Sequence, residues 1–291
     1  YRGTIAFAAG QFEDCLRLQT QSLQHAQHAG SHKWEATAEG GLGDAQYACG
    51  RMRLALEHFT HCLALCQEQG FMDIQARNQF MCGALKRYLG DQGSAISVLE
   101  DAASLSDRIH DVRGAMYVRI IIGEILMDAG DPVGAEAPLF EALEISRSLK
   151  NQRMEVYTVY ELARREMALG DISAARQNLD EAIKMGHATG IGFHGPRLYG
   201  LRARLAENDD ERHQWLNWGE DLLREGANAH NFLWFHRDAI DACLAAKEMK
   251  QVRYHCSALG ELVMADPLPW AEFFVAGGRV LADCAEGHSN I

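Results

Sequence analysis

Small and apolar positions recur along the chain with a period of 40 residues. Glycines fall into register at Gly10, Gly50, Gly90, Gly130 and Gly170, and an amphipathic segment follows each of them. Self-similarity at this period is typical of helical repeat proteins, in which each repeat buries its apolar face only against its neighbours. The pattern predicts an all-α solenoid of about seven 40-residue helix-turn-helix repeats with a C-terminal capping helix.

Three columns of small residues and one column of large residues run through these repeats. The small columns are Gly3, Gly43, Gly83, Gly123, Ala163, Ala203; Cys15, Ala55, Ala95, Ala135, Ala175; and Ser22, Cys62, Ala102, Ala142, Ala182. The large column is Phe59, Leu99, Leu139, Leu179. Small residues let helix axes approach each other, so we expect the large column to fill the space between them.

This order of small, small, large and small positions resembles the tetratricopeptide repeat (TPR), a helix-turn-helix unit, and the resemblance covers five repeats. Two features differ from the family. Its usual repeat has about 34 residues, and its closing proline is replaced here by Gln67, Asp107, Arg147 and His187. We expect the extra residues to extend the second helix toward glycines that end it, namely Gly30, Gly70 and Gly190.

The repeats predict pairs of helices with short turns. Residues 1–9 match the end of a first helix, which indicates that the chain begins inside a repeat of a longer protein. The later helices are expected at 11–29, 33–49, 51–69, 73–89, 92–109, 112–129, 132–149, 153–169, 172–188, 197–207, 210–224, 231–246, 251–264 and 271–285. Pro132 is expected in the first turn of its helix, with Asp131 as the cap. Residues 1–190 form the regular repeats, and residues 191–291 form degenerate repeats and a cap of the same continuous solenoid.

Composition narrows the classes of function. The formal net charge of −12 argues against a nucleic-acid partner, because affinity for phosphate backbones depends on lysine and arginine. No apolar run approaches the roughly 18 residues that span a bilayer, and the N-terminus lacks the pattern of a signal peptide. The expectation is a cytoplasmic protein with neither a membrane nor a nucleic-acid partner.

Candidate chemistry is sparse. Several of the eight cysteines replace alanine or another apolar residue in the repeat columns, as Cys15, Cys62 and Cys82 do, so we interpret them as reduced thiols in the core. Histidines at helical spacing, such as His58 and His61, are expected to face solvent rather than a metal. No nucleophile elbow, phosphate loop or metalloprotease motif is present. The sequence predicts no catalytic residue, no metal and no cofactor, and therefore not an enzyme.

The resemblance to the TPR family implies a concave groove that is lined by the first helix of each pair. The matching positions here are Tyr47, Arg77, Phe80, Arg87, Tyr88, Tyr117, Glu124, Met127, Tyr157, Tyr160, Arg164, Met167, Arg197, Arg204 and Arg237. Arginine and tyrosine are favoured in binding hot spots, although both also serve as amphipathic cover of a core. The family's clamp for a terminal carboxylate uses positions that hold Asp44, Ala84, Glu124 and Arg164 here, which does not support that mode. Arginine forks suit side-chain carboxylates or a phosphate instead.

Two aromatic segments near the C-terminus, 230–240 and 266–282, resemble the C-terminal parts of large bacterial signalling ATPases that carry a class III adenylate or guanylate cyclase domain. The resemblance implies a regulatory or scaffolding array, with the catalytic parts outside this chain. The aromatic residues themselves are expected to seal the end of the solenoid; they are Trp234, Phe235, Trp270, Phe273 and Phe274.

Three hypotheses for function remain open. The first is a protein-interaction scaffold that binds a protein, a peptide or another domain of its own parent chain through the Arg/Tyr-rich groove. The second is a sensor in which the groove binds an acidic metabolite or a short peptide. The third is a structural arm that associates with itself as a homo-oligomer.

Overall fold

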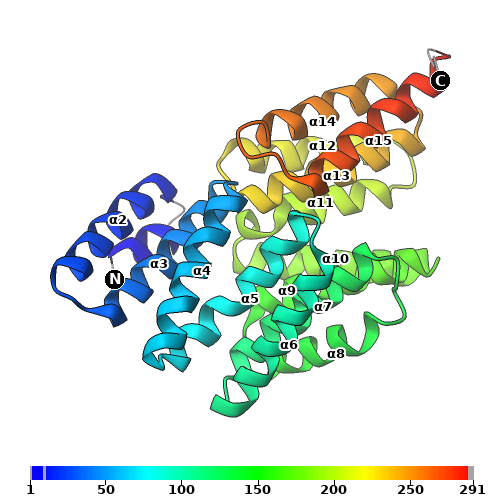
Figure 1. Cartoon of the computed structure of the whole chain (residues 1–291). Helices are drawn as coiled ribbons and strands as arrows, with labels where there is room; N and C mark the ends of the chain where they lie inside the picture. The colour runs from blue at the N-terminus through cyan, green and yellow to red at the C-terminus, as the bar shows by residue number, and fades with distance from the viewer. Residues whose placement is uncertain (1, 9–10, 288–291) are drawn as a thin grey trace. The chain divides into compact units, whose positions relative to one another are not determined.

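The computed structural model describes residues 2–8 and 11–287, and within these residues every regular element is helical (Figure 1). In chain order the helices are α1 (Arg2–Ala8), α2 (Phe12–His28), α3 (His32–Ala48), α4 (Met52–Gln69), α5 (Met72–Tyr88), α6 (Gln92–Ile109), α7 (Val112–Asp128), α8 (Glu136–Ser148), α9 (Gln152–Ala168), α10 (Ile172–Thr189), the 3₁₀ helix η1 (Ile191–Phe193), α11 (Gly195–Arg204), α12 (Asp209–Arg224), α13 (Ala229–Ala245), α14 (Met249–Leu262) and α15 (Pro269–Ala285). The predicted all-α, TPR-like solenoid class is confirmed.

The turns between helices follow the predicted chemistry. Gly70 has a φ of 74°, a left-handed conformation that ends α4, and Asp91 caps α6 by accepting a hydrogen bond from the backbone N–H of Ser94 at 3.3 Å. One repeat later than Gly70 the same left-handed position holds His110 (φ 56°), and the next repeat holds Lys150 (φ 51°). The turn is therefore a property of the repeat, and glycine is its favoured but not its required residue. Gly10, the first glycine of the 40-residue series, lies outside the described residues.

The columns of small and large residues meet as predicted. A methyl group added to Gly43 would lie 2.8 Å from the ring of Phe59, and one added to Gly83 would lie 2.5 Å from Leu99. Gly123 has the same relationship to Leu139, at 2.5 Å. Each glycine on a first helix thus faces the large residue of its partner helix, and the close approach leaves no room for a side chain.

Helix α8 begins later than predicted. The expected start at Pro132 is wrong: residues 132–135 form a turn, and the α-helix begins at Glu136. The carbonyl of Pro132 accepts a hydrogen bond from Arg165 Nε at 2.9 Å, and the N–H of Glu136 bonds to Val133 O at 3.2 Å instead. Asp131 still acts as a cap, since its carboxylate accepts from the N–H of Gly134 at 2.8 Å.

The chain forms two compact units. Unit 1 comprises Tyr1–Gly130 with Ala137–Ile145, and unit 2 comprises Asp131–Glu136 with Ser146–Ile291. Within unit 1 the helices pack in chain order, and α5 also touches α7; within unit 2, α11 packs on α12 and α13, and α15 packs on α13 and α14. The boundary predicted at residue 190, between regular and degenerate repeats, lies inside unit 2 and stays a prediction, as does a continuous solenoid.

The C-terminal repeats depart most from the expected boundaries. Helix α11 begins at Gly195 rather than Arg197 and ends at Arg204 rather than Glu207, with Pro196 in its first turn, where a missing N–H is harmless. Trp234, Phe235 and Trp270 are buried in unit 2 as expected, but Phe273 is 72% exposed, so its predicted role in sealing the core is wrong.

Candidate functional site

Residues 37 positions apart in the sequence meet on successive first helices. In unit 1, the rings of Phe80 and Tyr117 stack with their centroids 4.8 Å apart, and Arg87 pairs with Glu124. In unit 2, Arg204 pairs with Asp241 in the same way. This spacing is three residues shorter than the 40-residue repeat, and three residues are nearly one helical turn. A residue on one first helix therefore faces a position one turn earlier on the first helix of the next repeat.

Part of the predicted groove in unit 1 is inside the protein. Arg87 and Glu124 have side chains that are 1% and 2% exposed, and Arg87 Nη1 lies 2.5 Å from Glu124 Oε2. Arg87 Nε is also 3.7 Å from Asp128 Oδ2, and the guanidinium lies 4.8 Å from the centroid of the Tyr88 ring, which is buried too. These residues form an ion-paired core of the unit, in an environment where charges are retained only when they are paired.

The accessible part of this groove is an aromatic platform between two arginines, formed by Phe80, Tyr117, Arg77 and Arg113. Phe80 and Tyr117 are half-buried and stack almost in parallel, at an interplanar angle of 3°. Arg113 lies 5.9 Å above the Tyr117 ring, with its Nη2 3.5 Å from the Tyr117 hydroxyl. The exposed Arg77 makes one ion pair, with Asp73 one turn earlier on its own helix at 2.7 Å. Such surface pairs contribute little free energy, so both guanidiniums remain free to exchange partners.

The remaining predicted positions of unit 1 are Tyr47 on α3 and Met127 on α7, and both are half-buried. Near Tyr47, the Asp44 carboxyl has no ion-pair or hydrogen-bond partner among the described residues, and burial raises its pKa to about 7.

In unit 2 the predicted residues gather into a buried cluster of arginine and aromatic side chains. The indole of Trp234, fully buried, has Arg164 at 4.3 Å and Arg197 at 5.4 Å from its ring. Arg197 also lies 5.2 Å from the Tyr160 ring, and Arg164 Nη1 lies 2.6 Å from Glu161 Oε2. Burial, and secondarily the charge of Asp238, raises the pKa of Tyr160. These contacts stabilise packing and leave little of these side chains exposed.

The rest of the predicted positions in unit 2 are partly accessible. Arg204 and Arg237 share the carboxylate of Asp238, at 3.0 Å and 2.9 Å, and Asp238 itself is fully buried. Tyr157 and Met167 are half-buried. The ring of Tyr157 stacks against Arg197, whose guanidinium carbon is 4.7 Å from the ring centroid.

Sequence reasoning missed two residues that organise these surfaces, Arg113 and Asp238. Arg113 precedes Tyr117 by one helical turn, and Asp238 follows Arg204 by 34 residues. The 37-residue spacing of complementary residues on first helices finds pairs such as Phe80–Tyr117 and Arg204–Asp241, but neither of these two contacts has that spacing.

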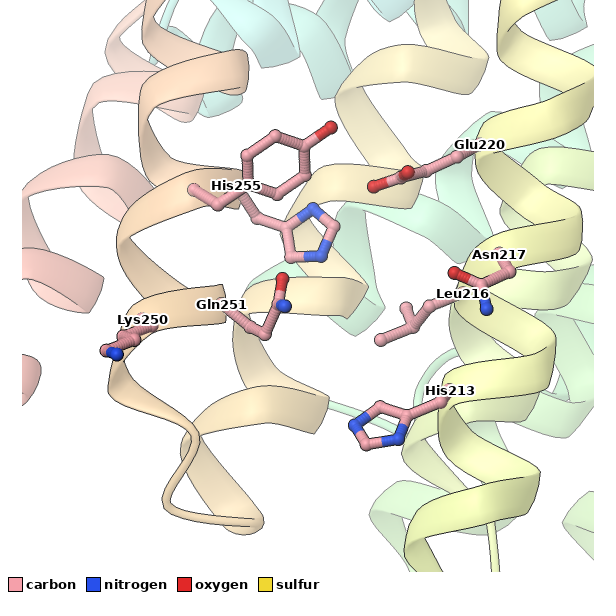
Figure 2. Close-up of a pocket in the computed structure, with 8 residues that line it drawn as sticks. His213, Leu216, Asn217, Glu220, Lys250, Gln251 and His255 are labelled. Atoms are coloured by element: carbon pink, nitrogen blue, oxygen red, sulfur yellow. The ribbon is translucent and has the colours of Figure 1, made fainter.

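A polar cleft of about 600 Å³ lies elsewhere in unit 2, between the second helices α12 and α14 (Figure 2). Its lining residues are His213, Leu216, Asn217, Glu220, Lys250, Gln251, Tyr254 and His255. Burial raises the pKa of Tyr254. The negative charge of Glu220 and the hydrogen bond that Glu220 accepts from Tyr254 raise this pKa further. His213 Nε2 is 2.8 Å from the Glu248 carboxylate. Hydrogen-bond donors and hydrogen-bond acceptors therefore both line the cleft.

One lining residue of this cleft, His255, belongs to a pair of buried histidines. Nδ1 of His236 lies 3.0 Å from Nδ1 of His255, and both side chains are at most 6% exposed. In the neutral pair, one Nδ1–H donates to the other Nδ1. Burial lowers the pKa of His236 to about 4, and burial together with the neighbouring His236 lowers the pKa of His255 to about 3.

Residues 2–8 and 11–287 meet neither the requirements of a metal site nor those of a membrane-spanning helix. No group of three or more histidine, cysteine or acidic side chains comes together there in an arrangement that suits a metal ion. Among the helices of this part of the chain, none combines the length and the apolar character that crossing a membrane requires.

The architecture is that of an all-α helical-repeat protein whose first helices carry an aromatic and arginine-rich face. Comparison with known families agrees: residues 1–68 match the family model of the tetratricopeptide repeat. The matched segment is similar to the tetratricopeptide repeat, and such repeats generally mediate protein–protein interactions and are generally not catalytic. No curated protein matches the chain.

Proposed function

We propose that the chain is a protein-interaction module that binds an extended peptide segment of a partner across the first helices of unit 1. The stacked pair of Phe80 and Tyr117 supports this proposal most directly, because it offers a flat aromatic surface between two exposed arginines. Aromatic and arginine side chains are those that dominate binding hot spots.

The charges around the platform favour a partner segment with acidic side chains. Arg77 and Arg113 flank the two rings, and a guanidinium holds a carboxylate or a phosphate through two parallel hydrogen bonds. The chain carries a net charge of −12. Two exposed arginines beside an aromatic pair are therefore a local concentration of positive charge on an acidic chain. An apolar side chain between two acidic residues would place its body on the rings and its neighbours near the arginines.

The test is selection of peptides from a random library displayed on phage, followed by titration of the selected peptides. Arg77→Glu and Arg113→Glu are expected to weaken binding at least tenfold, because each places a carboxylate next to the acidic peptide. Arg17→Glu is the matched control, since Arg17 is equally exposed and also pairs with an acidic residue within one turn, Asp14. Peptides that bind all three variants as they bind the unmodified chain would disprove the platform assignment.

A second candidate is a small-ligand sensor, favoured by the polar cleft between α12 and α14. Lys250 and His213 lie at this cleft and suit an organic acid, while Glu220 and Tyr254 suit its hydroxyl or amino groups (Figure 2). Thermal unfolding in the presence of a panel of organic acids separates this function from peptide binding. A ligand at 100 times its dissociation constant stabilises the protein by about 2.7 kcal/mol, and Lys250→Gln should remove that shift.

We propose the context of a larger signalling protein, in which this array regulates a nucleotide cyclase or an ATPase through contact with its other domains. The proposal rests on the resemblance of segments 230–240 and 266–282 to such proteins and on no further observation. A phosphate-binding loop and a cyclase signature in the same polypeptide would support it, and a different neighbouring module would exclude it.

A further inference from the structure

Helix α15 has an apolar seam on the surface that faces away from the rest of unit 2. Phe273, Gly277, Val280 and Cys284 follow one another at spacings of four, three and four residues, the spacing of a coiled-coil seam. Phe273 is 72% exposed and Val280 57%. The opposite side of α15 is buried against α13 and α14; its residues are Ala271, Val275, Gly278 and Ala282.

Contiguous exposed apolar surface usually marks an interaction site. Leu281, 54% exposed, widens the seam on one side. The ring of Phe274 packs edge-on against that of Phe273, with the centroids 5.2 Å apart, and most of the Phe273 side chain stays exposed.

The order of large and small residues along the seam is self-complementary. In an antiparallel pair of α15 helices centred between Gly277 and Val280, Phe273 of one helix lies opposite Cys284 of the other, and Val280 lies opposite Gly277. Each layer thus combines one large and one small side chain, which is the arrangement that fills space without overlap. Gly277 has nothing within 4 Å of the position where a side chain would begin, so a Val280 side chain has room there.

We propose that a second copy of this chain docks on this seam, with the two α15 helices antiparallel about a twofold axis. A closed twofold interface uses the same surface patch on both partners, as the layers require. The charges of α15 are on its flank next to α14, where Arg253 binds Asp283 at 2.8 Å and Glu286 at 2.5 Å. The seam itself carries no charge, so it favours another apolar seam over the acidic peptide proposed for unit 1.

The small area of the contact predicts a weak association. A pair of helices that meet over three turns buries less than the roughly 1,200 Å² of a standard stable interface. Dissociation constants in the micromolar range are therefore expected, and the dimer depends on protein concentration.

Sedimentation equilibrium between about 1 and 300 μM protein, a range that brackets weak interfaces, tests the proposal. Gly277→Gln is the decisive variant. Its side chain enters open space in the monomer and has a better helix propensity than glycine, so the folded monomer persists. In the dimer it occupies the space of Val280, so the dissociation constant should rise at least tenfold. Arg279→Gln, on the charged flank of the same helix, is the control and should leave the constant unchanged.

Disulfide trapping tests the antiparallel geometry. Phe273→Cys places a thiol opposite the exposed Cys284 of the second copy, within the separation at which disulfides form. Mild oxidation should then give a covalent dimer that is lost in the double variant Phe273→Cys, Cys284→Ser. A chain that stays monomeric at all concentrations, or a dimer that Gly277→Gln leaves unchanged, would overturn the proposal. A parallel arrangement, revealed by cross-linking of Cys284 to Cys284 in the unmodified chain, would also overturn it.

Discussion

Arg87 Nη1 lies 2.5 Å from Glu124 Oε2 in the interior of unit 1, and neither side chain is more than 2% exposed. Both residues occupy positions that the TPR resemblance assigns to a ligand-binding groove. In this chain the two charges satisfy each other across successive first helices, so the pair contributes to the structure of the groove. A reversal of charge at Arg87 consequently tests the fold and not the binding surface.

Removal of one member of this pair should be costly. Arg87→Met leaves the Glu124 carboxylate buried without its closest cation, a change that destabilises proteins by about 3–5 kcal/mol. The measurement is urea denaturation followed by circular dichroism. The double variant Arg87→Met, Glu124→Leu removes the closest ion pair as a whole, and we expect it to recover part of the loss, because only the Asp128 carboxylate then remains near the site without Arg87. Equal destabilisation by the single and double variants would contradict this account.

Much of the fold follows from the sequence, whereas the exposure of the groove residues does not. Gly43, Gly83 and their partners Phe59 and Leu99 reveal the helix pairs because a close approach needs glycine at fixed intervals. Periodicity placed Arg87 on the inner face but could not show that Glu124 faces it, because that depends on the tilt between helices of different repeats. The start of α8 was missed for a similar reason: the carbonyl of Pro132 is bonded to Arg165, a residue 33 positions away.

The close approach of Gly83 to Leu99 gives a second prediction. Gly83→Ala should destabilise unit 1 by about 1–3 kcal/mol, the usual cost of overpacking a core, because the new methyl group would lie 2.5 Å from Leu99. This cost exceeds the roughly 1 kcal/mol that alanine gains over glycine in a helix. Thermal unfolding compares it with Gly93→Ala on α6.

Gly93 is the matched control because it is helical and exposed, and nothing lies within 4 Å of an added methyl group. Gly93→Ala should therefore raise the stability by up to about 1 kcal/mol through helix propensity alone. Opposite signs for the two variants are the expected result. A stabilising Gly83→Ala would show that the columns of small residues are not required for packing.

Asp44 predicts a pH-dependent effect in unit 1. Its folded pKa of about 7 is higher than the value of 3.9 typical of an unfolded chain, so between pH 4 and pH 7 the folded state binds more protons. Stability contributed by this group therefore falls as pH rises through that window. Asp44→Asn should stabilise the protein at pH 8, by about 1–2 kcal/mol after allowance for solvent contact, and have little effect at pH 5. Equal effects at both pH values would exclude the shifted titration.

The buried histidine pair predicts the opposite dependence in unit 2. Burial lowers the pKa of His236 to about 4 and that of His255 to about 3, whereas an unfolded histidine titrates near 6.5. Between pH 6.5 and 4 the unfolded state binds more protons, so stability is greatest above pH 6.5 and declines as pH falls.

His255→Gln removes one of these titrating groups while keeping a side chain that hydrogen-bonds. Denaturation midpoints measured between pH 4.5 and 7 should fall less steeply with decreasing pH in this variant than in the unmodified chain, with a difference on the order of 1–2 kcal/mol over the range. His61→Gln, at an exposed position of α4, controls for loss of a histidine in itself. Identical slopes for His255→Gln and His61→Gln would mean that the pair does not stay neutral in the folded protein. A reduced slope for His255→Gln alone would identify the His236–His255 pair as the acid-sensitive part of unit 2, because protonation there forces apart two imidazoles that share one hydrogen bond.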